Sequence, residues 1–423
     1  MQLKKKNMSV KDALAVATCS LLAHAPQEAL ATATEGDWDF DFSLLDYQEV
    51  DRVRVVEWDV KSKWQYNDDA ALNFTVVSDS MTGATPSGAS VVPGAQAQTS
   101  TTASGTVVAS GLGEAAGNYL DPLVDFVDRR NGLGVDWERV FSRSITTNVG
   151  GSYSIEDDYS SMGVNGGLGI DLNNKLTRVS VGLAWIFDTV SPNIQGGPPP
   201  EGEQIGARTR FAYEDGEKLI VDKGLEITQV LNRRTVTKLS YVTGTTDGYL
   251  SDPYKIVTVK NNISGLPKSY YYEKRPNSRA RDALNWEYMH QMAGGAVFNS
   301  YYRFFWDDWD ITSHTLDMRY RIDFATTQYV QLHARYYEQS AAKFYTPNLT
   351  EDEERNLPEY MSSDYRLDKL KTQTIGLKYG FKFSQFGHFR IRFEKMSQTG
   401  TEGDFKELEA RILHAAISMK FGR

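Results

Sequence analysis

The chain has 423 residues, of which 40% are hydrophobic, 24% charged and 12% aromatic, with a formal net charge of −9 and one cysteine. The acidic balance argues against a nucleic-acid-binding surface, and a single cysteine excludes a disulfide framework or a multi-cysteine zinc site. The aromatic content is too high for a disordered chain, and no segment after the N-terminal region has the roughly 18 consecutive apolar residues of a membrane-spanning helix.

The first residues have the form of a secretory signal peptide. Three lysines precede a largely apolar stretch, and small residues follow at Ala29 and Ala31. The stretch is too short to span a membrane, and the small-x-small pattern favours cleavage after Ala31. Cys19 then lies in the removed peptide, and the alternative of lipid attachment there fits the preceding residues poorly. We therefore expect a signal peptide at residues 1–31 and a single outer-membrane domain at residues 32–423.

Apolar and polar residues alternate along much of the remaining chain. In 316–324 every even-numbered residue is apolar and every odd-numbered residue is charged, and 38–44 repeats the alternation with Asp39, Asp41 and Ser43 at the odd positions. Because successive strand side chains point to opposite faces, each such segment has one apolar face. The segments run roughly 10–14 residues, which is enough to cross a bilayer when tilted and longer than typical strands of soluble domains. Aromatic residues gather at segment ends, as in 301–306, which is typical of barrel girdles.

This pattern predicts an all-β fold, a transmembrane antiparallel β-barrel of about 16 strands. Counts of about 14 or 18 remain alternatives, because alternation is diluted around residues 130–156. The predicted strands are 37–48, 53–66, 70–79, 130–141, 143–156, 159–171, 176–188, 221–231, 235–246, 281–292, 295–306, 312–324, 328–340, 370–383, 387–398 and 409–421.

Connections between the predicted strands alternate in length. From a periplasmic N-terminus, all periplasmic turns are short, whereas 80–129, 189–220, 247–280 and 341–369 fall at the other end. Short periplasmic turns and long extracellular loops are the rule in outer-membrane barrels. We therefore expect periplasmic termini and long extracellular loops in the outer membrane of a Gram-negative bacterium, in contact with lipid and lipopolysaccharide. Within these loops, 253–262 is predicted either to fold inward or to hold a short strand of an external hairpin.

Several stretches resemble a family of uncharacterised bacterial outer-membrane β-barrel proteins that is known as a domain of unknown function. The stretches are 79–89, 229–235, 247–255, 275–279, 307–315, 335–342 and 363–367. The resemblance covers nearly the whole mature chain and implies a barrel in the outer membrane, without a defined activity or catalytic residues. It also implies a small lipoprotein or a redox protein as a partner. The C-terminus departs from the usual barrel pattern, since Phe421 is followed by Gly422 and Arg423.

The sequence offers few candidates for chemistry. Asp310, Ser313 and His314 could belong to a hydrolase triad at the barrel rim, but a polar strand end accounts for them more simply. Two acidic stretches, 307–310 and 351–354, carry the oxygen ligands that Ca²⁺ prefers, although solvated surface charge is the simpler interpretation. We expect no enzyme activity, no catalytic residues, no cofactor and no metal.

The charged half of each strand is the main functional candidate. The predicted lumen-facing residues carry both signs of charge and are Glu57, Asp59, Lys61, Lys63, Asp317, Arg319, Arg321, Asp323, His333, Arg335, Lys378, Arg390, Arg392 and Glu394. They can form ion pairs that brace the wall, or their field can select small polar solutes in a water-filled pore. The leading hypothesis is a porin-like channel for small polar solutes or ions. The alternatives are a structural or docking barrel for partner lipoproteins or redox proteins and, third, an outer-membrane enzyme.

Overall fold

The structure, a computed structural model, describes residues 36–90, 119–192, 197–206 and 214–422. The predicted signal peptide and Cys19 lie outside these ranges. The barrel strands are β1 (Trp38–Glu49), β2 (Val53–Asn67), β3 (Ala70–Pro86), β4 (Leu123–Ser142), β5 (Ile145–Ile155), β6 (Tyr159–Leu172), β7 (Thr177–Val190), β8 (Gly216–Asn232), β9 (Thr235–Gly248), β12 (Ser278–Gln291), β13 (Val297–Asp307), β14 (Thr312–Ala325), β15 (Gln328–Gln339), β17 (Leu370–Ser384), β18 (Gly387–Gly400) and β19 (Glu407–Phe421).

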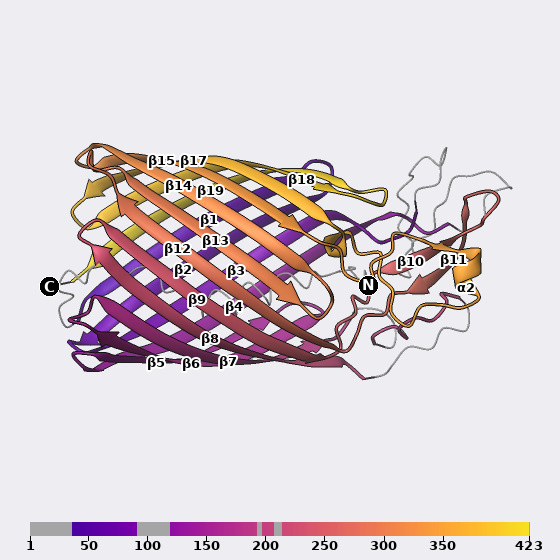
Figure 1. Ribbon diagram of the computed structural model, residues 1–423, viewed down its shortest axis with the longest axis horizontal. Coiled ribbons are helices and arrows are strands. Elements are labelled where there is room, and N and C mark those ends of the chain that lie inside the picture. Colours follow the sequence, from indigo (N-terminus) through magenta and orange to yellow (C-terminus); the bar gives the residue numbers. More distant parts are fainter. Residues whose placement is uncertain (1–35, 91–118, 193–196, 207–213, 423) are drawn as a thin grey trace, which may run out of the picture.

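These sixteen strands close into one antiparallel barrel, which confirms the predicted fold class (Figure 1). Closure is made by β1, which pairs with both β2 and β19, so that Trp38 lies opposite Trp64 on one side and Phe421 on the other. A closed sheet leaves no strand edge with unpaired backbone groups. No helix in the described ranges is long and apolar enough to cross a membrane.

The outer face of the barrel is apolar. Ile375, Phe393 and Leu332 are 66%, 54% and 52% exposed, and apolar exposure on this scale is typical of a lipid-facing surface. Aromatic side chains gather at both ends of this face. At one end Trp38 stacks on Trp64 with ring centroids 5.5 Å apart. At the other end the rings of the Phe304–Trp306 pair are 5.1 Å apart, so the face has two aromatic girdles.

The two ends of the barrel differ in their connections. At the end that carries Trp38 and Phe421, hereafter the turn end, the connections are short. The one between β6 and β7 places Asn173, Asn174 and Lys175 at positive φ, a conformation that asparagine adopts more readily than most residues. The opposite end, hereafter the loop end, carries all the long connections.

Three strands, β3, β4 and β8, extend at least five residues further toward the loop end than the alternation predicts. The predicted end of the third strand at Asp79 and the predicted start of the fourth at Arg130 are wrong, because β3 and β4 remain paired up to Pro86 and Leu123. β8 likewise begins at Gly216. The Ser-, Thr- and Gly-rich sequence after Asp79 is typical of a loop, but its backbone groups form hydrogen bonds with the neighbouring strands.

Beyond the strand ends at the loop end, connecting segments build a second folded body, hereafter the cap (Figure 1). The cap is made of residues 87–90, 249–277, 307–311, 340–369 and 401–406. It contains a three-stranded sheet in the order β11 (Pro267–Tyr272), β10 (Ile256–Lys260) and β16 (Leu349–Thr350), followed by α2 (Glu351–Glu354) and the 3-10 helix η1 (Tyr365–Leu367).

The cap has its own hydrophobic core. Val257, Val259, Leu349 and Met361 are at most 1% exposed and pack together. Since β10 forms an antiparallel hairpin with β11 outside the barrel, the hairpin alternative for 253–262 is correct and the inward loop is wrong. All but one of the stretches that carry the family resemblance lie in the cap or at the strand ends that enter it.

Candidate functional site

The polar face of the barrel strands lies opposite the apolar face, and its side chains meet across intervening strands. Lys63 of β2 lies 3.1 Å from Glu138 of β4, and Arg281 of β12 lies 2.7 Å from Asp222 of β8. Strand curvature brings side chains of alternate strands together on the concave face. The polar face therefore lines the lumen.

The structure places the predicted lumen residues on this face in two groups. The group on β2 consists of Glu57, Asp59, Lys61 and Lys63. The group on β14, β15, β17 and β18 consists of Asp317, Arg319, Arg321, Asp323, His333, Arg335, Lys378, Arg390, Arg392 and Glu394. The β2 group is largely paired, since Lys61 lies 3.4 Å from Asp59 and Glu57 lies 3.7 Å from the guanidinium of Arg130.

His333 connects the second group. Its Nδ1 lies 2.6 Å from Glu394 Oε1 and its Nε2 lies 2.9 Å from Asp317 Oδ2. Arg319 pairs with Asp317 at 3.1 Å, and Arg392 lies 3.5 Å from Glu394. Both carboxylates are buried, with side chains 6% exposed. They are therefore engaged in bracing the wall.

A glycine makes the contact between His333 and Glu394 possible. Gly376 on β17 pairs with His333 on one side and Glu394 on the other. A Cβ at this position would lie 2.5 Å from Cγ of Glu394, so a larger residue would displace the glutamate. The glycine thus leaves the space in which side chains from β15 and β18 meet across β17.

Three cations of the same wall have no such partner. Arg303 on β13, Arg335 on β15 and Lys378 on β17 have no carboxylate within ion-pair distance in the part of the chain that the structure describes. The like charges of Arg392, Arg319 and Arg390 act on Lys378, with Glu394 as the opposing charge. We call six inward cations of β13–β18 the basic wall, namely Arg303, Arg319, Arg335, Lys378, Arg390 and Arg392.

The wall across the lumen is small and polar. In strand order, β5, β6 and β7 lie half a circumference from β15, β17 and β18. Their inward residues include Asn148, Asn165, Gly167, Ser180 and Gly182, which line a hollow. The side chains on this wall project little into the lumen. The lumen is therefore asymmetric, with long cationic side chains on one side and mostly short uncharged ones on the other, where Arg178 of β7 is paired with Asp171 of β6 at 3.2 Å.

A buried ion-pair network joins two segments of the cap. Arg275 lies 2.7 Å from Glu273 and 2.9 Å from Asp364, while Arg366 contacts Asp364 and lies 2.9 Å from Asp252. Glu273 and Asp364 are almost completely inaccessible to solvent. Burial alone would raise the pKa of Asp364, but the guanidinium groups of Arg366 and Arg275 hold that pKa far below its ordinary value. Burial raises the pKa of Glu273, although Arg275 opposes this.

The cap connects segments from around the barrel rim. Ser90, after β3, donates its backbone N–H to Oγ1 of Thr258 at 3.1 Å. Tyr254 donates its hydroxyl to Asp158, before β6, at 2.6 Å. On the other side Thr401, after β18, donates its backbone N–H to Asp368 at 2.8 Å. Because these segments start from different sectors of the rim, the cap extends over the mouth at the loop end.

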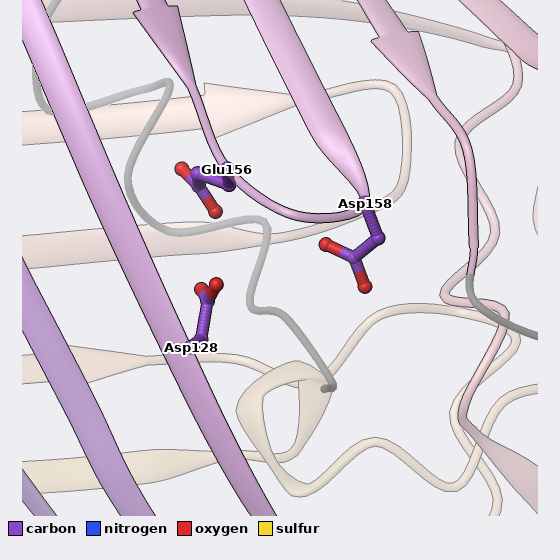
Figure 2. A group of neighbouring side chains, drawn as sticks. All are labelled: Asp128, Glu156 and Asp158. Carbon is purple, nitrogen blue, oxygen red and sulfur yellow. The ribbon is translucent and has the colours of Figure 1, made fainter. Parts of the chain in front are cut away.

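One acidic cluster was not predicted from the sequence. Asp128 on β4 and Glu156 and Asp158 between β5 and β6 are buried, and one carboxylate oxygen of each lies within 4.8 Å of the others (Figure 2). All three also take part in further interactions. Sequence reasoning missed the cluster because the fourth strand was predicted to begin at Arg130, which left the inward position of Asp128 unassigned.

The predicted acidic stretches do not form cation sites within the described ranges. Asp307 pairs with Arg279. Glu351 and Glu354 each lie 2.9 Å from the ammonium of Lys268. These carboxylates are therefore used in ion pairs that hold the cap.

The hydrolase triad is also not assembled. Ser313 lies on the inner face and is 5% exposed. His314 lies on the outer face, where its Nδ1 is 2.7 Å from the hydroxyl of Tyr302. Adjacent residues of a strand point to opposite faces, so the two side chains cannot act together.

Several solved structures with similar barrels share little sequence with this chain. They include the CymD monoaromatic hydrocarbon channel, with 9% identity, a TM-score of 0.42 and coverage of 92% of this chain and 90% of that one. Outer membrane protein OpdK from Pseudomonas aeruginosa has 7% identity, a TM-score of 0.40 and coverage of 92% and 99%. A bacterial polysaccharide outer membrane secretin has 8% identity, a TM-score of 0.45 and coverage of 92% and 100%. At these identities the likeness concerns the fold alone.

The closed barrel with its exposed apolar face is that of a Gram-negative outer-membrane protein. No curated protein matches the sequence. Residues 11–411 match the family described as "Protein of unknown function (DUF3570)". Because this match covers nearly the whole sequence, the chain belongs to the DUF3570 family of outer-membrane β-barrels.

Proposed function

We propose that the protein is a porin-like channel for small polar solutes or ions, with a cap over its outer mouth. The asymmetric lumen carries this proposal, because a basic wall faces a wall of short side chains. A barrel of sixteen strands is wide enough to enclose water. The loop end is extracellular in this proposal, in keeping with the long loops of outer-membrane barrels.

The cap gives the channel an access step. Its segments are joined by the network around Asp364 and by backbone contacts such as the one between Ser90 and Thr258. Solute entry from outside requires these contacts to separate locally or to leave a side path. We therefore expect a conductance that is small or intermittent in the native chain and larger when the cap is loosened.

Single-channel recording in planar bilayers tests the proposal. The full chain and a variant with a weakened cap, Asp364→Asn, are reconstituted at equal protein concentration. Discrete current steps in the native chain, with a higher open probability in the variant, are the expected result. A folded barrel that passes no current in either form would show that the lumen is not a channel.

The folded cap favours a second candidate, a structural or docking barrel for a lipoprotein or redox partner. A body with its own core, including Val257 and Met361, has the rigidity that a docking surface needs. Affinity purification from native membranes separates the two functions. A lipoprotein recovered in equal amount with a non-conducting barrel would support docking, whereas conductance without such a partner would support the channel.

A further inference from the structure

Many carboxylates of the lumen are paired with a cation. Glu138 pairs with Lys63, Asp222 with Arg281, and Glu226 lies 3.6 Å from Lys238. Near the turn end Arg321 and Asp323 pair with each other at 2.9 Å. On the basic wall, Asp317 and Glu394 are shared between His333 and two arginines. Negative charge at these positions is therefore neutralised where it lies, whereas Asp128, Glu156 and Asp158 gather in an acidic cluster near the loop end.

On β13–β18, by contrast, the inward cations outnumber the inward carboxylates, so this wall carries a surplus of positive charge. Arg390 has a partner in Asp41 of β1, and Arg319 and Arg392 have theirs on neighbouring positions. Arg303, Arg335 and Lys378 remain without a carboxylate among the described residues. The chain as a whole has a net charge of −9, so a positive lumen wall is not a consequence of a basic protein.

These three cations lie where a solute would pass. Arg335 is exposed, and Arg303 and Lys378 are half-buried on the inner face. Arg303 is also subject to the like charges of Arg281 and Arg335. Repulsion between neighbouring cations is relieved when an anion lies among them. A guanidinium fork matches the geometry of a carboxylate or a phosphate and can bind it with two hydrogen bonds.

We propose that the channel selects small anions that carry a carboxylate or phosphate group, and that Arg303, Arg335 and Lys378 are its selectivity residues. The proposal rests on the channel function above and adds the sign and the chemical class of the solute. The small polar wall of β5–β7 provides the space through which the anion passes, while the basic wall holds it.

The test is the reversal potential under a KCl gradient, measured on the full chain and on chains with the cap-loosening substitution Asp364→Asn. Three further chains carry Arg335→Gln, Lys378→Gln or both. The control is Lys371→Gln, which removes the same charge from β17 on the outer face, where Lys371 is 53% exposed. Heat-modifiable gel mobility confirms that each variant forms the barrel.

We expect the native chain to prefer chloride over potassium, the double variant to lose this preference several-fold, and the control to keep it. Added inorganic phosphate or succinate should reduce the chloride current of the native chain, and much less that of the double variant. The stronger of the two blockers identifies phosphate or carboxylate as the preferred group.

Two results overturn the proposal in different ways. Conductance that prefers potassium, or a chloride preference that the double variant retains, refutes anion selection and leaves the channel intact. Absence of any current in all chains, including those with the loosened cap, refutes the channel itself and the selectivity with it.

Discussion

Replacing Asp364 with asparagine removes the negative charge that lies between two guanidinium groups in the cap. The side chain of Asp364 is 1% exposed, and those of Arg275 and Arg366 are 5% and 14% exposed. An amide keeps the size of the side chain but cannot compensate either cation. The substitution therefore tests the electrostatic contribution of this position with little change in packing.

Because the ion pairs of Asp364 are buried, its replacement should lower the stability of the closed cap. Removing one partner of a buried ion pair destabilises a protein by about 3–5 kcal/mol. The lower end of this range applies here, because Arg275 retains its ion pair with Glu273 and Arg366 retains its ion pair with Asp252. About 3 kcal/mol lowers the ratio of closed to open cap by roughly a hundredfold. The barrel should persist, since the network lies outside its hydrogen-bonded sheet.

The matched control is Asp352→Asn in α2, also in the cap. Asp352 pairs with Arg355 at 3.4 Å, but the two side chains are 72% and 81% exposed, and ion pairs on the surface contribute little. Limited proteolysis of the cap and the open probability in bilayers should both rise in the Asp364 variant and stay unchanged in the control. Equal behaviour of the two variants would refute the assignment of Asp364 as the residue that holds the cap closed.

Two further predictions concern pH and the lumen wall. The pKa of Asp364 is far below its ordinary value, so its contribution to stability is present above the unfolded pKa of about 4 and is lost as the pH falls below it. The pKa of Glu273 is raised, so the free-energy penalty of its buried charge disappears as the pH falls toward about 4. Protection of the cap from protease should therefore hold or rise slightly as the pH falls to that value, and decrease below it. A steady loss of protection from neutral pH downward would contradict this. In the wall, Gly376→Ala should displace Glu394 and lower barrel stability by about 1–3 kcal/mol in urea. The control is Gly134→Ala, where the nearest atom to the new Cβ would be 3.7 Å away, and it should lower the stability much less. Equal urea midpoints of unfolding for the two variants would show that the space at Gly376 is not needed.

The alternation of residues predicted the barrel well because it depends only on which face each residue occupies. Residues 316–324 divide between lipid and lumen as the period-two pattern requires. The pairing partners of the lumen residues could not be predicted in the same way. His333 reaches Glu394 only because of the register of three strands and because Gly376 lies between them, and neither is visible in the local pattern.

The cap was beyond prediction for a different reason. Its segments have little periodicity, and its contacts join distant parts of the chain, as between Arg275 and Asp364. The stretch after Asp79 illustrates the same limit, because its small polar residues are typical of a loop but pair along β4 as far as Pro86. Where a fold depends on long-range pairing of irregular segments, composition alone does not identify it.

The cap and the lumen wall use charge in opposite ways, and this difference supports separate roles. In the cap, the carboxylates of Glu273, Asp364 and Asp252 face the cations of Arg275 and Arg366, with Lys255 nearby. Burial lowers the pKa of Lys255, and the carboxylates oppose this. Matched buried charges favour one arrangement and have no capacity left for a ligand. On the basic wall, by contrast, cations outnumber the carboxylates beside them and face the lumen, so their charge is available to a passing anion. A closed state held by matched charge, above a path lined by unmatched charge, is the arrangement expected of a channel whose opening and selectivity can be altered independently.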